Sequence, residues 1–406
     1  MLYWIIIAIC VAEFIYSSLI HFLNNKAAGL PIPSVLTGLY DEETYRKQQD
    51  YRRQNARVSY TNTCVDSVIQ ISLFAFGGFA LFDAWGQHYF SSSPIVVALV
   101  FFGLVYLCSW IPGIPFGIYG TFVIEERFGF NRTTPKTYFL DTVKWLLLTI
   151  VIGGGFIVFF VWLYKLVPDY FWIIAWAAVS CFSLFMIFFY SDLIVPLFNK
   201  QRPLDQGELR DAIEAFASKV SFKLKDIYVI DGSKRSAHAN AYFTGYGSRK
   251  RIVLYDTLME QLTTDEIVGV LAHEIGHYKH GHIYKGIITS LLTNLLMFFV
   301  FGLVMKSPAI AAAAGCTEPS FHINLMVFGL VYSPFNEVLS IIDNIISRRH
   351  EWQADEFAKA NGMGYAVSSA LKKMSKKSLA NLTPHPFTVF VRYSHPTLKD
   401  RVIHLE

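Results

Sequence analysis

Apolar and polar residues follow one another along this 406-residue chain in long blocks. A helix needs about 20 mostly apolar residues to cross the hydrocarbon layer of a bilayer. Seven blocks approach that length, at about 2–23, 64–82, 95–124, 143–163, 171–191, 284–305 and 323–346. The third block contains Pro112 and Pro115, so we expect a kink or an irregular turn there. The pattern predicts seven membrane-spanning helices.

The distribution of Lys and Arg between these blocks supports the count. Basic residues gather after the first, third, fifth and seventh blocks, whereas each loop after the second, fourth and sixth contains at most one. Cytoplasmic loops of membrane proteins carry an excess of basic residues. The alternation therefore predicts an amino terminus outside and a carboxyl terminus in the cytoplasm.

Two polar segments, 192–283 and 347–406, are expected to lie in water on the cytoplasmic side, where they can meet. They divide the chain into helices 1–5 (1–191), the first polar segment, helices 6 and 7 (284–346) and the carboxyl-terminal segment. The first polar segment is expected to hold a helix at 208–220, strands at 226–230 and 251–255 with a Gly-rich connection, and a helix from about Thr264 through His277. The second is expected to hold a helix over 347–361, a stop at Gly362 and a further helix.

Composition agrees with a membrane protein, because 53% of the residues are hydrophobic and only 16% are charged. Soluble domains carry roughly 25% charged residues. The net charge of +4 is small and dispersed, which argues against a nucleic-acid partner. The five cysteines form no CxxC pair, so neither a disulfide framework nor a thiolate zinc site is expected.

The strongest chemical motif is His273-Glu274-Ile275-Gly276-His277, within the helix expected from about Thr264. Residues four apart share one face of a helix, so both imidazoles can bind one metal ion. Glu274 stands beside the first histidine, where it can take a proton from the attacking water and pass it to the leaving amine. The alternative is a helix with two surface histidines. The helix start, the polar surroundings and further partners favour zinc ligands at His273 and His277, with Glu274 as the catalytic base.

A catalytic zinc site uses three protein ligands and leaves one position open. The polar sequence after the seventh block offers Glu351 and Asp355, which are four residues apart and so share a helical face. In zinc sites with two histidines and one glutamate, a carboxylate one turn after that glutamate accepts the other ring N–H of a ligating histidine. We assign Glu351 to the metal and Asp355 to the histidine, against the alternative of a solvated charged helix. This ligand set favours one Zn²⁺ per chain.

These residues resemble those of the type I CAAX prenyl proteases, integral-membrane zinc endopeptidases also called a-factor-converting enzymes. The resemblance also rests on the stretches 278–282, 347–355, 232–243 and 393–396. It implies a mainly α, polytopic membrane protein with seven transmembrane helices around a large chamber, plus a gluzincin-like zinc protease domain with a small β-hairpin. The implied activity is hydrolysis of prenylated CAAX-type or other membrane-associated peptides, in contact with membrane lipid.

The resemblance implies roles for five further residues. Asn240, Ala241 and Tyr242 match the family's edge strand, where a peptide substrate pairs by main-chain hydrogen bonds. His395 and Arg401 match positions that steady the substrate carbonyl and the developing oxyanion. Two alternatives stay open, namely a purely structural role for His395 and an ion pair between Arg401 and a nearby carboxylate.

His280 and His282 are expected beside the site rather than on the metal, because three ligands are already present.

The chain is shorter than eukaryotic members of the family and ends without a retention signal. These features predict a bacterial inner-membrane protein, or the ER membrane if the source is eukaryotic. The alternative functions are a heat-shock-type quality-control protease and a transporter or channel; the last usually has ionisable residues within several spans.

Overall fold

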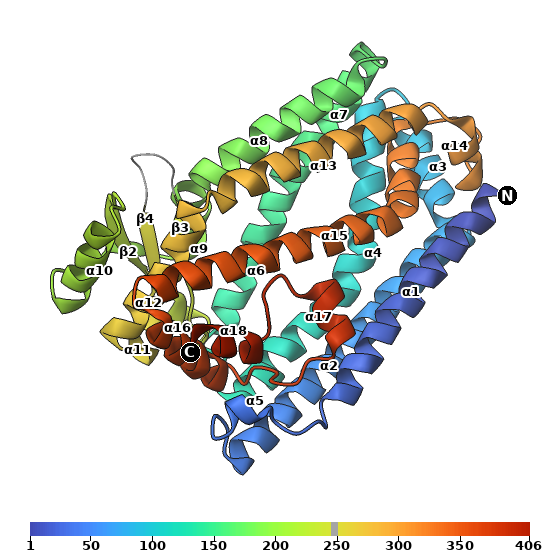
Figure 1. The fold of residues 1–406 in the computed structure, drawn as a ribbon. Coiled ribbons are helices and arrows are strands. Elements are labelled where there is room, and N and C mark those ends of the chain that lie inside the picture. Colours follow the sequence, from blue (N-terminus) through green and yellow to red (C-terminus); the bar gives the residue numbers. More distant parts are fainter. Residues whose placement is uncertain (245–250) are drawn as a thin grey trace.

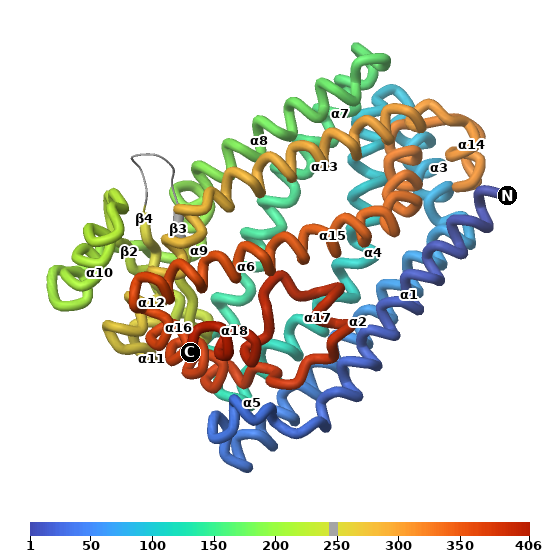
Figure 2. The backbone as a smooth tube through the Cα atoms, in the orientation of Figure 1, coloured from blue at the N-terminus to red at the C-terminus, as the bar shows by residue number. Residues whose placement is uncertain are grey.

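Long helices carry the apolar blocks of the sequence (Figures 1 and 2). The computed structural model describes residues 1–244 and 251–406. The helices of the apolar blocks are α1 (Leu2–Ala27), α2 (Glu42–Ala75), α3 (Gly78–Phe90), α4 (Pro94–Tyr119), α6 (Pro135–Leu148), α7 (Gly154–Leu166), α8 (Phe171–Leu193), α13 (His282–Val304) and α15 (Phe321–Ala360). Within the described residues, six helical segments are long and apolar enough to cross a membrane, and the bent pair α2–α3 raises the count to seven. Only 11–17% of each segment's most apolar window is buried, so its side chains face outward as a bilayer requires. The mainly α, polytopic fold class is confirmed.

The second and third spans differ from the straight helices and the proline kink that the sequence suggested. The expected block 64–82 is broken at Gly77, whose φ of +71° lies in the left-handed region, and α2 and α3 meet at 65°. Helix α4 continues through Pro112 and Pro115, and its irregular part comes later, as a π-helical turn over Gly120–Glu125. Neighbouring helices and side chains can satisfy the backbone groups that a proline leaves without a hydrogen bond. The distortion of the helix therefore need not fall at the proline itself.

The last span and the helix after it are one element. We expected a span over 323–346 and a separate helix over 347–361, but α15 runs unbroken for 40 residues. It ends at Ala360, and Gly362, whose φ is +83°, follows where the sequence predicted the stop. A continuous helix with Pro334 inside it therefore joins the membrane part of the chain to the carboxyl-terminal segment (Figure 1, orange to red).

The two polar segments pack together around one core. The strands β1 (Gln201–Pro203), β2 (Asp226–Ile230), β3 (Ala241–Thr244) and β4 (Arg251–Tyr255) form a mixed sheet in the order β1-β2-β4-β3. The expected strands 226–230 and 251–255 are confirmed, but they pair in parallel, and the sheet is larger than the small hairpin expected. Residues 245–250 of the Gly-rich connection lie outside the described residues.

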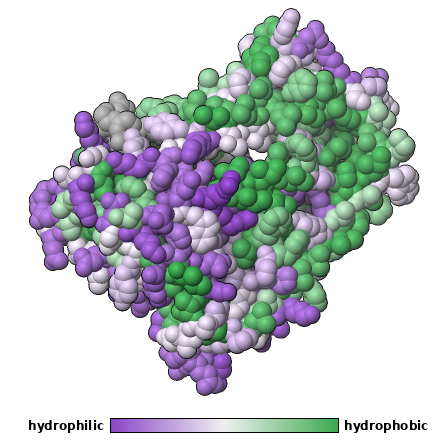
Figure 3. All heavy atoms as spheres, in the orientation of Figure 1, coloured by the Kyte–Doolittle hydropathy of each residue, from purple (hydrophilic) through white to green (hydrophobic). Residues whose placement is uncertain are grey.

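Helices cover this sheet and connect it to the membrane part. They are α5 (Glu126–Phe128), α9 (Val195–Phe198), α10 (Glu208–Lys219), α11 (Asp256–Gln261), α12 (Thr264–Lys279), α16 (Gly364–Lys377), α17 (Pro386–Arg392) and α18 (Leu398–Leu405). The short helix α14 (Pro308–Ala313) instead packs against α1 and α15 in the membrane part. Ile267 of α12, Ala358 of α15 and Val367 of α16 share one buried cluster, so the segments 192–283 and 347–406 meet as predicted. Hydrophilic residues gather over this part of the molecule in Figure 3, and hydrophobic residues over the long helices.

Candidate active site

Helix α12 carries the HExxH motif, and its first turn is firmly anchored. The Glu266 carboxylate accepts a hydrogen bond from the Thr263 backbone N–H at 2.8 Å, while the Thr263 hydroxyl accepts from the Glu266 N–H at 3.4 Å. This is the capping box that the sequence predicted. The same carboxylate pairs with Lys373 of α16 at 2.7 Å and accepts from the Ser369 hydroxyl at 2.6 Å. These contacts set the start of α12, and therefore its angular position, against α16.

Glycines let α12 approach its two neighbours closely. A β-carbon built on Gly276 would lie 2.9 Å from the α-carbon of Ala354 in α15, and one built on Gly269 would lie 3.0 Å from the Val367 nitrogen in α16. Real side chains do not occupy such positions without moving the backbone. The two glycines are seven residues apart, on one face of α12, so that face can lie directly against the helix that carries Glu351.

The three predicted ligands come together where α12 crosses α15. One ligand atom each from His273, His277 and Glu351 lies within 4.8 Å of the others. The Nε2 atoms of the two histidines are 3.2 Å apart, and they lie 3.4 and 3.2 Å from the two Glu351 oxygens. The Glu351 side chain is buried, yet its Oε2 atom accepts no hydrogen bond from any residue in the described ranges 1–244 and 251–406. A buried carboxylate oxygen without a hydrogen bond is costly unless a cation binds it, so these residues fit a metal ion.

The hydrogen bonds of His273 suit ligation through Nε2. Its Nδ1 atom lies 2.8 Å from Asp355 Oδ1, to which it donates, leaving the Nε2 lone pair for a metal. Arg401 donates to both oxygens of the buried Asp355, at 2.8 and 2.6 Å, and its Nη1 approaches Glu351 at 3.4 Å. Burial acts to lower the pKa of His273, but its close contacts with the Asp355 and Glu351 carboxylates outweigh this and raise the pKa to about 9. A metal ion must therefore displace a proton from this imidazole.

A second chain of hydrogen bonds supports His277. Its Nδ1 atom is 3.0 Å from Nδ1 of His282, and His282 Nε2 is 2.8 Å from Oε1, the side-chain amide oxygen of Gln353. One tautomer set satisfies every contact: His277 Nδ1–H donates to His282, and His282 Nε2–H donates to Gln353. That set leaves His277 Nε2 free to bind a metal. The ring of His282 also stacks on His350, with ring centres 4.0 Å apart.

The remaining predicted residues surround this cluster. Glu274 is partly buried and forms no hydrogen bond or ion pair with any described residue, so its carboxylate is available to a substrate or water. His395 is 61% exposed, and its Nε2 lies 3.4 Å from Glu351 while Nδ1 contacts the Ser394 hydroxyl at 2.9 Å. Arg401 makes the carboxylate ion pair that the sequence left open as an alternative. Its contact with a substrate stays a prediction.

Strand β3, which begins at Ala241, lies at the edge of the sheet and pairs with β4 on one side only. The Tyr255 N–H donates to the Asn240 carbonyl at 3.0 Å, so the main-chain groups of Asn240 face β4. Main-chain groups alternate in direction along a strand, so those of Ala241 face the open edge. In the structure the Ala241 N–H is bonded to the Asn240 side-chain oxygen at 2.9 Å, an acceptor that a peptide strand would replace.

Both His282 and Arg401 were placed at the site from the sequence, but some of their contacts were not predicted. His282 was expected near the metal ligands, but nothing in the pattern connected it to Gln353. Arg401 was matched to substrate, whereas its described contacts are with Asp355, Glu351 and His273. Glu351 and Gln353 are two residues apart and lie on different faces of one helical turn. Nothing in this spacing indicates that Glu351 contacts His273 and His277 whereas Gln353 contacts His282.

A helix-borne HExxH motif facing a glutamate from a distant helix, in a chain with up to seven spanning segments, defines a membrane-embedded metallopeptidase. Residues 21–200 match the family described as CAAX prenyl protease N-terminal, five membrane helices, and residues 203–406 match peptidase family M48. The chain belongs to this family of CAAX prenyl proteases and is a zinc metalloendopeptidase. The transporter or channel alternative is therefore excluded.

Known relatives match nearly the whole chain. The CAAX prenyl protease 1 homolog of Mus musculus is 33% identical, over 91% of this chain and 88% of its own length. The CAAX prenyl protease 1 of Saccharomyces cerevisiae is 32% identical, over 99% and 94%. The crystal structure of S. mikatae Ste24p superimposes with a TM-score of 0.94 at 32% identity, covering 100% of this chain and 99% of that one.

Proposed function

We propose that this protein hydrolyses prenylated CAAX-type peptides at a single zinc ion held by His273, His277 and Glu351. The observation that carries the proposal is the convergence of these three side chains around a buried carboxylate oxygen that accepts no hydrogen bond within the described part of the chain. The substrate class follows from the names of the relatives, which are CAAX prenyl proteases over nearly their full length. Hydrolysis of peptides is common to the family. The specific part of the proposal is that the peptide is prenylated.

Zinc, when bound, supplies a Lewis acid that polarises the scissile carbonyl and makes water more acidic. Glu274 accepts the proton of the attacking water and delivers it to the leaving amine, because its carboxylate has no other partner among the described residues. His395, which is mostly exposed beside Glu351, donates to the substrate carbonyl as negative charge develops there. Asp355 keeps His273 in the tautomer that offers Nε2, and Arg401 fixes Asp355 and contributes positive charge near the oxyanion.

The substrate backbone adds to the sheet beside β3. Ala241 supplies the outward-facing main-chain groups, and Asn240 and Tyr242 flank it on one face. Recognition through the main chain holds an extended peptide whatever its side chains. The charge pattern of the loops supports a cytoplasmic site in a multi-pass membrane protein, with the bacterial inner membrane, or the ER membrane if the source is eukaryotic, as the proposed location.

The test is cleavage of a quenched fluorescent farnesylated CAAX peptide by detergent-purified protein, with metal content measured on the same samples. Wild type and Glu274→Ala should both contain about one zinc per chain, and only wild type should cleave. Because Glu274 is a base rather than a ligand, its loss should lower kcat by about 10²- to 10⁴-fold without removing the metal.

Two results would contradict the proposal in different ways. Zinc-loaded wild type that leaves the peptide intact would refute the substrate and favour the quality-control alternative. Wild type that neither contains zinc nor cleaves after zinc is added would refute the assignment of the metal ligands.

A further inference from the structure

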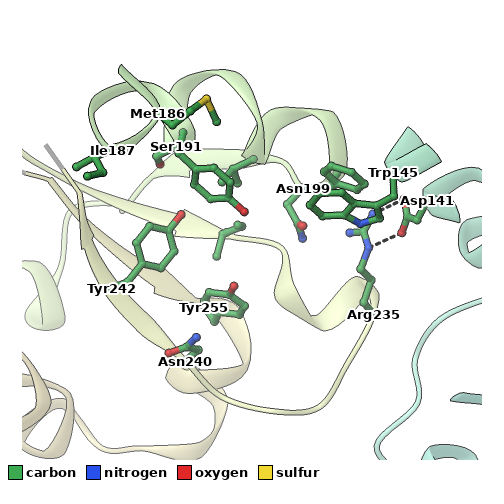
Figure 4. Close-up of a pocket in the computed structure, with 14 residues that line it drawn as sticks. Asp141, Trp145, Met186, Ile187, Ser191, Asn199, Arg235, Asn240, Tyr242 and Tyr255 are labelled. Carbon is green, nitrogen blue, oxygen red and sulfur yellow. Dashed lines mark hydrogen bonds and ion pairs between the residues drawn. The ribbon is translucent and has the colours of Figure 1, made fainter. Parts of the chain in front are cut away.

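A cavity of about 790 Å³ adjoins the proposed substrate edge (Figure 4). It lies between the sheet and the ends of α6 and α8, where these helices leave the membrane part of the chain. Its volume is within the range of about 300–1,000 Å³ that is typical of small-molecule sites. A site of this size beside a peptide-binding edge can hold a large group attached to the peptide.

The cavity faces the same side of the sheet as two residues of the substrate edge. Asn240 and Tyr242 both line it, whereas Ala241 between them does not. Side chains alternate between the faces of a sheet, and directly opposed residues of neighbouring strands share a face. A peptide strand added beside β3 therefore directs every second side chain, those opposite Asn240 and Tyr242, toward this cavity.

The wall opposite the sheet is apolar and aromatic. Trp145 of α6 stacks on Phe198 of α9 at 4.8 Å, and α8 contributes Met186, Ile187 and Tyr190. Trp145 and Tyr190 are 52% and 46% exposed within the protein, on helical segments that are long and apolar enough to cross a membrane. Trp and Tyr are enriched at the boundary between the bilayer and water. An apolar chain can therefore reach the cavity from the bilayer without crossing water.

One end of the cavity is polar. Arg235 donates from Nε and Nη2 to the Asp141 carboxylate, at 2.7 and 3.0 Å. The third guanidinium nitrogen, Nη1, is buried and has no hydrogen-bond partner among the residues that the structure describes. Figure 4 shows this ion pair at one side of the cavity, across from Tyr242. An apolar wall with one unused donor suits an apolar chain joined to a peptide, whose carbonyl or carboxylate can accept from Arg235.

We propose that this cavity binds the isoprenoid chain of a prenylated cysteine while the adjoining peptide pairs with β3. The inference rests on the proposed function, and it gives the enzyme a structural basis for preferring a lipid-modified substrate. The chain would enter laterally between α6 and α8, and its burial among aromatic side chains would lower KM.

The direct test is photo-crosslinking with a CAAX peptide whose isoprenoid carries a diazirine, using zinc-loaded Glu274→Ala so that the peptide stays intact. Mass spectrometry should locate the adduct on residues 135–148, 171–193 or 195–198, the helices that line the cavity. Adducts confined to helices that do not line the cavity would overturn the proposal. Because this measurement uses the unaltered cavity, it does not depend on whether a cavity variant folds.

The kinetic test fills the cavity with Ile187→Trp and compares prenylated with unmodified peptide of the same sequence. The ratio of the two kcat/KM values should fall by about tenfold, because the isoprenoid loses most of its buried surface. Phe185→Trp is the matched control, since Phe185 lies on the opposite face of α8 and does not line the cavity; it should keep the wild-type ratio. An unchanged ratio in Ile187→Trp, with both peptides cleaved, would refute the cavity and leave the proposed function standing. Loss of all cleavage by wild type would refute the proposed function instead.

Discussion

Gly276 of α12 lies directly against Ala354 of α15, so closely that a β-carbon on Gly276 would stand 2.9 Å from the Ala354 α-carbon. This contact lies between the two histidines of α12 and the glutamate of α15. It determines how near the three proposed ligands can come. Gly276, which stands between the ligands His273 and His277 in the HExxH motif, is therefore part of the site geometry, although glycine itself binds nothing.

Gly276→Ala should weaken zinc binding. The added methyl group forces α12 and α15 apart, at a cost of about 1–3 kcal/mol for an overpacked contact, which corresponds to about 5- to 150-fold in zinc affinity. Competition with a fluorescent zinc chelator measures the affinity. Gly286→Ala is the control, because a β-carbon there meets nothing within 4 Å. Equal affinity in Gly276→Ala and wild type would show that the helix contact does not set the site.

His282→Ala should also weaken zinc binding, but through the tautomer of His277. Without its acceptor at 3.0 Å, the His277 Nδ1–H loses the bond that orients the ring. Loss of such an outer partner typically reduces metal affinity by about 10- to 100-fold. His280→Ala is the matched control, since His280 is exposed and two residues away. Gln353→Leu should show a smaller loss in the same direction. An effect of His280→Ala equal to that of His282→Ala would contradict this role.

Much of the site could be predicted because its residues lie close together in sequence. The capping box, the HExxH helix and the pair Glu351 and Asp355 each follow from spacings within one or two turns. The strands 226–230 and 251–255 were equally clear from their apolar runs. Each of these features depends on local periodicity, which a single sequence carries directly.

The features that were missed depend on contacts between distant segments. The sequence did not indicate that the last span and the helix after it are one element, because it turns polar near Ser347. A change from apolar to polar residues alters the surroundings of a helix but does not end it. The parallel pairing of β2 with β4 and the bond from His282 to Gln353 join residues more than 20 positions apart. No local pattern encodes such partners.

Glu266→Gln should destabilise the domain around α12 in a pH-dependent way. Burial acts to raise the pKa of Glu266, but hydrogen bonds from Lys373, Ser369 and the Thr263 N–H lower it below its ordinary value. A group with a depressed folded pKa stabilises the protein above its unfolded pKa of about 4.3, and that stabilisation is lost as pH falls through the folded pKa. The variant should therefore have a lower Tm than wild type at pH 7, with the difference shrinking below about pH 4.

Thermal unfolding in detergent, followed by tryptophan fluorescence at several pH values, measures this difference. Asp265→Asn is the control, because Asp265 is the exposed neighbour of Glu266. A Tm difference for Glu266→Gln that stays constant down to pH 4 and below would mean that the carboxylate charge does not matter.

Glu125→Gln should raise KM for peptide substrates while changing kcat little. Glu125 ends the π-helical turn of the third span, accepts from the Tyr51 hydroxyl at 2.6 Å and lies 3.5 Å from His238 Nε2. His238 stacks on Phe130 and is two residues before Asn240. The charge on Glu125 therefore helps to hold the segment that leads into the substrate edge, at a distance from the metal ligands.

The expected increase in KM is about five- to tenfold, the effect of weakening one hydrogen bond to a charged group. Steady-state kinetics with the farnesylated peptide separates KM from kcat, and zinc content should stay at the wild-type level. Glu43→Gln, an exposed change at the start of α2, should leave both constants unchanged. A fall in kcat with an unchanged KM would place the effect of Glu125 at the metal centre rather than at β3, because the edge strand acts on binding and the metal ligands act on the chemical step.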